Sequence, residues 1–237
     1  MPRDVYITLD IDWAPDYMLD FVLKYLTKYN IKATWFITHK SRSVDEIISN
    51  HDLFDSGIHP NFQDNSSQGK NIDEVINFFN IFLPNATSMR THSYVQSWNI
   101  LEKITKNSNI KIDLSYYSPR IQKIERTMYF YDNNSSLIRI PTFWEDHLEI
   151  FRPDKDWEFN CIESVEGPII LNFHPVHIYC NTIDVNDYNE IKPYIKEKGK
   201  VEEYIDLKRK GFGPFFSFLK IIQNKEYFSC RKISDLI

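Results

Sequence analysis

The sequence of 237 residues lacks the features of two large classes of protein. It has no apolar run near the roughly 18 residues that a membrane-spanning helix needs. It also has no long basic run, and its net charge is −5, whereas proteins that bind nucleic acids cluster Lys and Arg against the phosphates. We therefore expect no stable membrane insertion and no nucleic-acid partner.

Cysteine is scarce, and Cys161, Cys180 and Cys230 are far apart with no CxxC pair. This spacing gives no disulfide framework and no thiolate zinc site, and it suits a reducing compartment. The first residues run directly into an apolar segment, without the apolar h-region and small-residue cleavage site of a signal peptide. We therefore expect a cytoplasmic protein. Nothing in the sequence indicates an oligomeric state.

Aromatic residues are abundant, since 17 Phe, 14 Tyr and 5 Trp make up 15% of the chain. Aromatic side chains bring large apolar area to any core, so an aromatic core is the simpler interpretation. A groove that stacks sugar rings is the alternative.

Short apolar segments alternate with segments of helical periodicity, with no fixed-period repeat and no composition shift that would mark a domain boundary. The strands are expected at 5–9, 32–38, 57–59, 87–92, 110–114 and 168–173. The helices are expected from Pro15, at 44–49, 72–82, 97–106 and 214–223. Residues 117–149 fit an irregular loop with one or two short strands, and 192–200 fit a solvated connector. The alternation predicts right-handed βαβ units around a parallel sheet or barrel, in a single domain over 1–237.

Polar residues gather where these strands end. In α/β barrels the carboxyl ends of the strands and the loops that follow carry the working residues. Five of the seven histidines lie at or beside such ends, namely His39, His59, His92, His174 and His177. Asp10 and Asp12 end the first strand, and a later loop carries 144–147.

Imidazole and carboxylate together are the ligand set of Zn²⁺ and similar ions. Asp10 and Asp12 are two residues apart, so they share one side if the strand persists. Two such carboxylates need a compensating cation, which a metal ion and Arg90 would supply. The alternatives are that the two acids cap the helix at Pro15, and that each histidine is an ordinary hydrogen-bonded polar residue.

The order of these motifs resembles the polysaccharide deacetylase superfamily with NodB homology, in a divergent surface-polysaccharide branch. The resemblance covers nearly the whole chain. It lies in Thr8-Leu9-Asp10-Ile11-Asp12, Gly57-Ile58-His59, Arg90 with Tyr94, Trp144-Glu145-Asp146 and Leu171-Asn172-Phe173-His174. It implies a distorted (β/α) barrel of about seven parallel strands, with 1–237 as its catalytic domain.

The resemblance also implies a role for each matching residue. Asp10 is the expected general base, which Arg90 orients, and His174 is the expected general acid, with Asp146 beside it. Asp12 and His59 are the expected metal ligands. The residues expected to contact substrate are Trp13, Tyr94, Trp144 and Leu171.

One motif departs from the family pattern, in which a second metal-binding histidine follows four residues after the first. Gln63 stands at that position, and Pro60 replaces the usual Ser or Thr. We predict His92 as the third ligand, because it follows Arg90 by two residues on a presumed strand. Asn61 and Gln63 are weaker candidates, since amide oxygens suit harder ions than Zn²⁺.

These residues predict a metal-dependent hydrolase that removes N-acetyl groups from a sugar or a nucleotide- or lipid-linked sugar in surface-polysaccharide biosynthesis. The expected cofactor is a divalent metal, Zn first, then Co, Ni or Fe. The alternatives are a carbohydrate-binding protein of the same fold without activity, an O-acetyl sugar esterase, and a glycosidase that uses Asp10 and Glu145.

Overall fold

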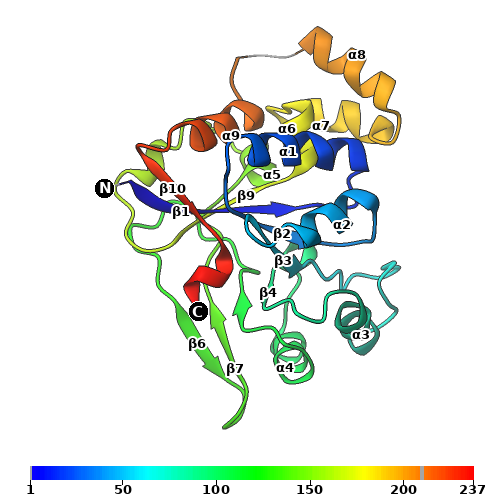
Figure 1. Cartoon of the computed structure of the whole chain (residues 1–237), viewed down its shortest axis with the longest axis vertical. Coiled ribbons are helices and arrows are strands. Elements are labelled where there is room, and N and C mark those ends of the chain that lie inside the picture. The colour runs from blue at the N-terminus through cyan, green and yellow to red at the C-terminus, as the bar shows by residue number, and fades with distance from the viewer. Residues whose placement is uncertain (1, 209–210) are drawn as a thin grey trace.

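The computed structural model describes residues 2–208 and 211–237, and the side chains of all of these except 206–208. One curled, mostly parallel sheet runs through the molecule, and helices cover it (Figure 1). This half-barrel confirms the predicted α/β class and the single domain.

The sheet contains ten strands among the described residues, in place of the predicted seven or so. They are β1 (Arg3–Asp10), β2 (Ala33–Ile37), β3 (Phe54–Ile58), β4 (Ser88–Met89), β5 (Ile112–Asp113), β6 (Thr127–Phe130), β7 (Ser136–Arg139), β8 (Trp144–Glu145), β9 (Ile169–Phe173) and β10 (Phe228–Arg231). The order is β6-β7-β5-β4-β3-β2-β1-β9-β8, with β10 also paired to β1. Every pairing is parallel except that of β6 with β7.

The helices fill the connections between strands. The α-helices are α1 (Asp16–Lys28), α2 (Arg42–Ser49), α3 (Ile72–Phe82), α4 (Trp98–Asn107), α5 (Asp146–Glu149), α6 (Pro175–Cys180), α7 (Val185–Ile191), α8 (Lys198–Lys208) and α9 (Pro214–Gln223). Four short 3-10 helices are η1 (His92–Tyr94), η2 (Asn160–Ile162), η3 (Lys192–Tyr194) and η4 (Ile233–Leu236). None of the helices in the described part of the chain has both the length and the apolar content needed to cross a bilayer.

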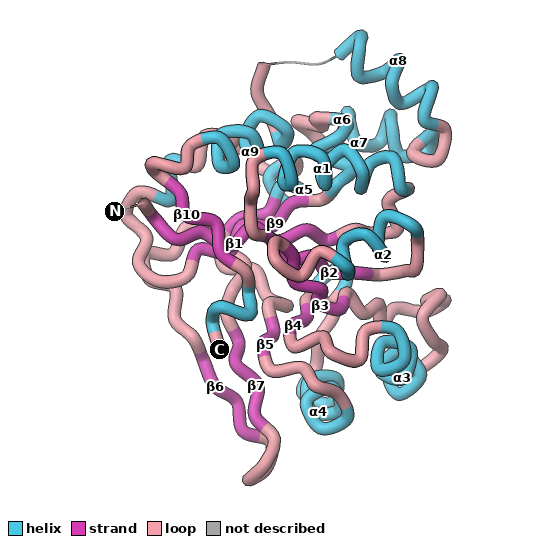
Figure 2. The backbone as a smooth tube through the Cα atoms, in the orientation of Figure 1, coloured by secondary structure: helices cyan, strands magenta, loops and turns pink. Residues whose placement is uncertain are grey.

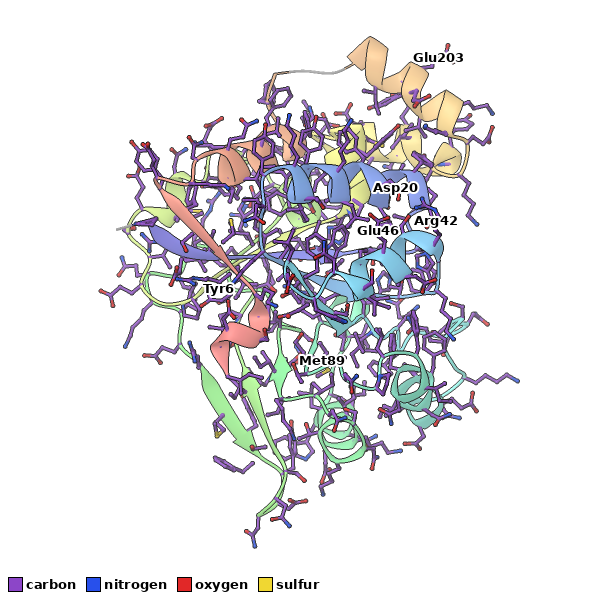
Figure 3. The ribbon with its side chains drawn as sticks, in the orientation of Figure 1. Tyr6, Asp20, Arg42, Glu46, Met89 and Glu203 are labelled. Atoms are coloured by element: carbon purple, nitrogen blue, oxygen red, sulfur yellow. The ribbon has the colours of Figure 1, made fainter. Side chains whose placement is uncertain are left out.

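Local sequence explains where several helices begin. Ser41, Asn71 and Ser97 each accept a hydrogen bond from a backbone N–H in the first turn of α2, α3 and α4. Such N-caps satisfy donors that the helix leaves unpaired. Helix α1 packs against α2 and α6, and Arg42 of α2 lies beside Asp20 of α1 and Glu46 (Figure 3).

The core strands are covered on both faces. Val5 to Asp10 of β1 are all buried, as is every residue of β2 and β9. Strands buried on both sides read as continuous apolar runs, which is why they stand out in the sequence as short apolar segments. Because β1, β2, β3 and β9 are parallel, their carboxyl ends meet at one edge of the sheet.

Two predicted strands are shorter than expected, and one region holds more structure. The strand predicted at 87–92 ends at Met89, because the chain then turns into η1, where Ser93 and Tyr94 have positive φ. The strand predicted at 110–114 is reduced to β5. Residues 117–149 contain three short strands and α5, and β6 and β7 form a hairpin that projects from the body (Figure 2). The presumed connector at 192–200 contains η3 and the start of α8.

Gly57 of β3 leaves the space that the Phe36 ring fills. A Cβ at Gly57 would lie 2.5 Å from Phe36 Cε1 and 2.8 Å from Ser88 Oγ. We predict that Gly57→Ala lowers the free energy of unfolding by about 1–3 kcal/mol, the usual cost of overpacking. Urea denaturation measures this. Gly199→Ala in α8 is the control, since nothing lies within 4 Å of its added Cβ; equal effects of the two substitutions would contradict the prediction.

Candidate active site

A buried ion pair joins the ends of β1 and β4. Arg90 Nη1 donates to Asp10 Oδ1 at 2.8 Å, and both side chains are at most 4% exposed. Strands β2 and β3 separate β4 from β1, a distance of about 14 Å along a flat sheet at the usual strand spacing. The contact therefore requires the curl of the sheet, and it crosses the interior of the half-barrel.

The remaining donors of Arg90 are almost all used. Nη1 also donates to Asn172 Oδ1 at 2.6 Å, Nη2 to Thr8 Oγ1 at 3.0 Å and Nε to Thr142 Oγ1 at 3.1 Å. The guanidinium also stacks over the Phe36 ring at 4.7 Å. Four of its five N–H groups thus have partners, which fixes the plane of the guanidinium.

Asn172 holds the second oxygen of Asp10. Its Nδ2 donates to Asp10 Oδ2 at 2.9 Å, while Arg90 holds Oδ1. The carboxylate therefore has one defined orientation, as a group that must receive a proton from a particular direction requires.

Asp12 lies between two histidines. His59 Nε2 is 3.0 Å and His92 Nδ1 is 3.1 Å from the same oxygen, Asp12 Oδ1. The two imidazole rings are 5.5 Å apart, centre to centre, at an angle of 82°. One carboxylate and two imidazoles whose ligand atoms lie within 4.8 Å of one another are able to hold a metal ion. This arrangement contradicts the alternative in which Asp12 caps α1, whose N-cap is Pro15 without a side-chain hydrogen bond.

The backbone brings these residues together in a way that the sequence argument did not foresee. Strand β1 ends at Asp10, and Asp12 and Trp13 have φ of 39° and 55°; Ser93 and Tyr94, after His92, have φ of 54° and 55°. Non-glycine residues rarely adopt this left-handed conformation, and it costs free energy. Sequence spacing predicted that Asp10 and Asp12, and likewise Arg90 and His92, share one side because residues two apart alternate along a strand. That reason was wrong, because turns bring the two members of each pair together.

A third pair, His174 and Asp146, faces the same centre. His174 Nδ1 lies 2.6 Å from Asp146 Oδ1, and the His174 backbone N–H donates to Asp146 Oδ2 at 2.8 Å. Its other nitrogen, Nε2, lies 3.7 Å from Asp12 Oδ2 and 4.0 Å from Asp10 Oδ2. The imidazole is therefore oriented by a buried carboxylate and aimed at both aspartates.

Burial and charge act against each other in this cluster. Burial opposes ionisation of Asp12, but hydrogen bonds to His59 and His92 outweigh it and hold the pKa of Asp12 well below its usual range. Burial lowers the pKa of His174, but the charges of Asp146, Asp12 and Glu145 raise it to about 10. An imidazole that keeps its proton near neutral pH is suited to act as an acid.

The family model of WbmS-like polysaccharide deacetylases matches residues 7–192, more than half of the chain. The chain belongs to this family. A crystal structure from Bordetella bronchiseptica, to which a polysaccharide deacetylase role in O-antigen biosynthesis is ascribed, has a TM-score of 0.80 and 24% identity, and the alignment covers 93% of this chain and 90% of that one. No curated protein matches the sequence significantly.

Two more distant structures also match this chain. A 4-α-glucanotransferase from Thermococcus litoralis has 9% identity and a TM-score of 0.53, over 99% of this chain and 38% of that one. A CE4-family pseudoenzyme from Bacillus anthracis has 15% identity and a TM-score of 0.43, over 89% of this chain and 68% of that one. The likeness to the structures with TM-scores of 0.80 and 0.53 shows a shared fold alone.

The four residues predicted to contact substrate occupy different positions in this member of the WbmS-like family. Trp13 is half-buried and packs edge-on against His92, with the rings 5.3 Å apart. The Tyr94 hydroxyl donates to Glu145. Leu171 is fully buried in β9, so its predicted contact with substrate stays a prediction. Trp144 departs from the prediction: it is 2% exposed, and its ring packs edge-on against Phe159 and tilted against Phe173, so it offers no face to a sugar.

The structure also distinguishes the candidates for the third metal ligand by their positions. The Gln63 side chain is exposed. The side-chain oxygen of Asn61, the other amide candidate, already accepts a hydrogen bond from the backbone N–H of Gln63. Gln68, which the sequence argument missed, is buried and donates to the carbonyls of Thr38 and His59. Gln68 therefore fixes the loop after His59. Among the candidates, the position of His92 Nδ1 beside Asp12 favours His92 as the third ligand.

Three further residues near the cluster lie in segments that the sequence analysis pointed to, but they received no predicted role. Asn172 stood in a quoted motif without a role, although a buried amide two residues before His174 on a strand shares its face. His147 Nδ1 lies 2.9 Å from His177 Nε2, beside His174. Burial and the charge of His174 lower the pKa of His147 to about 4, and burial holds the pKa of His177 well below its usual range, so this second pair is uncharged near neutral pH.

We predict that Arg90→Met destabilises the protein by about 3–5 kcal/mol, because it leaves the buried Asp10 carboxylate without its partner. Urea unfolding followed by fluorescence measures this. The double variant Asp10→Asn/Arg90→Met removes both charges and is expected to lose less than the single variant. Arg42→Met is the surface control, since Arg42 is 61% exposed and such pairs contribute at most about 1 kcal/mol. A loss for Arg90→Met as small as that for Arg42→Met would refute the interpretation.

Proposed function

We propose that this chain is a metal-dependent deacetylase that removes N-acetyl groups from a sugar during surface-polysaccharide assembly, with residues 1–237 as one catalytic domain. One observation carries the proposal: the Asp12–His59–His92 cluster lies between an oriented carboxylate, Asp10, and an oriented imidazole, His174. Membership of the WbmS-like polysaccharide deacetylase family supports it.

The three residues of the cluster fit a divalent metal ion. Two ligands at about 2.0–2.1 Å from a tetrahedral Zn²⁺ lie about 3.3 Å apart, close to the 3.0 and 3.1 Å seen here. His59 Nε2, which faces Asp12 Oδ1, would be the ligand atom, and the buried Nδ1, without a hydrogen-bond partner among the described residues, would keep the ring proton. The bound ion would supply Lewis acidity toward the acetyl carbonyl and lower the pKa of a water molecule. Zn is the proposed ion, with Co, Ni or Fe as alternatives.

Asp10 acts as the general base in this proposal. It takes the proton from the attacking water as the water oxygen adds to the acetyl carbon. Arg90 and Asn172 hold both carboxylate oxygens, so the acceptor does not rotate away. The buried Arg90 charge also offsets the negative charge of the Asp10 carboxylate beside Asp12.

His174 acts as the general acid. The proton on its Nε2 passes to the leaving sugar amine as the carbon–nitrogen bond breaks, because an unprotonated amine would leave as a poor anion. Asp146 accepts the hydrogen bond from Nδ1 and thereby sets the tautomer and the ring orientation. The products are acetate and a sugar with a free amino group.

The proposed substrate is an N-acetylated sugar that is linked to a nucleotide or a lipid, and the proposed location is the cytoplasm. The role in O-antigen biosynthesis ascribed to the Bordetella bronchiseptica protein is consistent with this step. A panel of N-acetylated nucleotide sugars, with matched O-acetylated sugars, tests the proposal by acetate release. Release from O-acetyl sugars alone would instead support an esterase. Acetate release that persists in the presence of a chelator would support a hydrolase that needs no metal, and the absence of release would support a binding protein.

For the metal site we predict about one equivalent of a divalent transition metal per chain. His92→Ala is expected to weaken metal affinity at least tenfold, because it removes one of three ligands, whereas Gln63→Ala leaves affinity unchanged. Competition with a chelator measures both variants. Unchanged affinity in His92→Ala would exclude His92 from the site.

For the proton-transfer groups we predict that Asp10→Asn and His174→Ala each lower turnover by about 10²–10⁴-fold, the usual contribution of a positioned acid or base. The metal content and the thermal midpoint are measured in parallel, and both are expected to persist. Loss of the metal in Asp10→Asn would show that the roles of Asp10 and Asp12 are exchanged.

A further inference from the structure

The hairpin of β6 and β7 ends the sheet with an open strand edge. Among the described residues β7 is the strand that pairs with β6, and the outer side of β6 has no neighbour in the sheet. The hairpin projects from the body of the molecule, away from α1 and α6 (Figure 1). Open edges are templates for pairing with another strand, so natural proteins usually protect them.

The hydrogen-bond register shows which residues of β6 face outward. Tyr131 N–H donates to Ser135 O, so 131 and 135 form a hydrogen-bonded pair, and alternation makes 129 with 137 another. Independently, Ile138 N–H donates to Lys111 O of the neighbouring segment, away from β6. The N–H and C=O groups of Met128 and Phe130, the residues between, therefore point to the open edge.

The outward residues also carry exposed apolar side chains. Met128 is 50% and Phe130 is 67% exposed, and strand alternation puts both on one face of the hairpin. Tyr129 and Tyr131 lie on the other face, where they contact Arg139 and Trp98. An open edge with two large exposed hydrophobic side chains is the opposite of a protected edge.

We propose that β6 pairs antiparallel with β6 of a second copy of this chain, so that the sheets of two molecules join across a twofold axis. A register in which Met128 faces Phe130 of the other copy brings together the outward N–H and C=O groups of both strands. The same register places Tyr129 opposite itself on the axis. It therefore forms two apolar cross-strand pairs on one face.

Charge complementarity selects this register over its neighbours. Just outside β6, the exposed Arg126 lies near the exposed Asp132 of the other copy at each end of the paired segment. Within one chain Arg126 Nη1 donates to Leu236 O and Asp132 lies 3.5 Å from Lys106 Nζ, and the new ion pairs add to these contacts. A shift by one residue pair in either direction places Met128 opposite Asp132 or Arg126 opposite Phe130. Those registers lose the two ion pairs and half of the apolar contacts. The edge is thus self-complementary, as an interface with twofold symmetry must be.

Sedimentation velocity over a concentration series tests the proposal on the full chain. The expected result is a monomer–dimer equilibrium whose dissociation constant rises about 100-fold or more in Met128→Pro. Proline is compatible with β6 because the lost N–H faces outward and not toward β7. Phe130→Lys tests the apolar contact without a backbone change, and both variants should keep the thermal midpoint. Ile81→Lys is the matched control, since Ile81 is 71% exposed on α3 and should leave the dimer unchanged.

Disulfide capture tests the register in a background with Cys161→Ser and Cys230→Ser. Tyr129→Cys is expected to form a covalent dimer, because residue 129 faces itself in a non-hydrogen-bonded pair, where side chains lie closest. Met128→Cys and Phe130→Cys are expected to cross-link far less, since each faces the other position. Efficient capture through 128 or 130 would overturn the register. A monomer at every concentration, or a dimer that Met128→Pro leaves intact, would overturn the proposal.

Discussion

The Arg90–Asp10 contact is the constraint on which the rest of the site depends. A guanidinium buried without partners would cost several kcal/mol, so Arg90 requires acceptors on every side. Most of those acceptors come from β1 and β9, which lie far from β4 along the sheet, and one, Thr142, comes from the segment before β8. The sheet must therefore curl for Arg90 to be satisfied, and the curl carries Asp12, His59 and His174 toward one another.

This dependence explains why the polar residues of the site are hard to separate into structural and chemical groups. Asn172 completes the hydrogen bonding of Arg90 and also orients Asp10. Asp146 receives both a backbone and a side-chain hydrogen bond from His174, so it fixes the start of α6 and the tautomer of the ring. Removing either residue would change both the shape of the site and the hydrogen bonds that set where its protons lie.

Much of this arrangement was predictable from the sequence. Helices α3 and α9 have the predicted bounds, because each carries one apolar stripe and ends beside Pro84 or Asn224. The residues of the cluster were found because parallel strands expose their carboxyl ends at one edge. The pairing of β10 with β1 was not predicted, since Phe228–Arg231 is short and has no buried residue. The left-handed turns at Asp12 and Ser93 were missed too, because neither contains the glycine that usually marks such a turn.

The pairing of β1 also has a consequence for how the chain folds. Arg3 of β1 pairs with Phe228 of β10, and Val5 pairs with Ile169 of β9, so the central strand depends on residues that are synthesised much later. While the chain emerges from the ribosome, β1 and β2 present a long apolar surface with one edge unpaired. Contacts over such sequence separations slow folding and expose intermediates to aggregation. Strand β1, which ends at Asp10 just before the turn that holds Asp12, thus acquires its final neighbours late in synthesis, so its apolar surface stays uncovered in nascent chains.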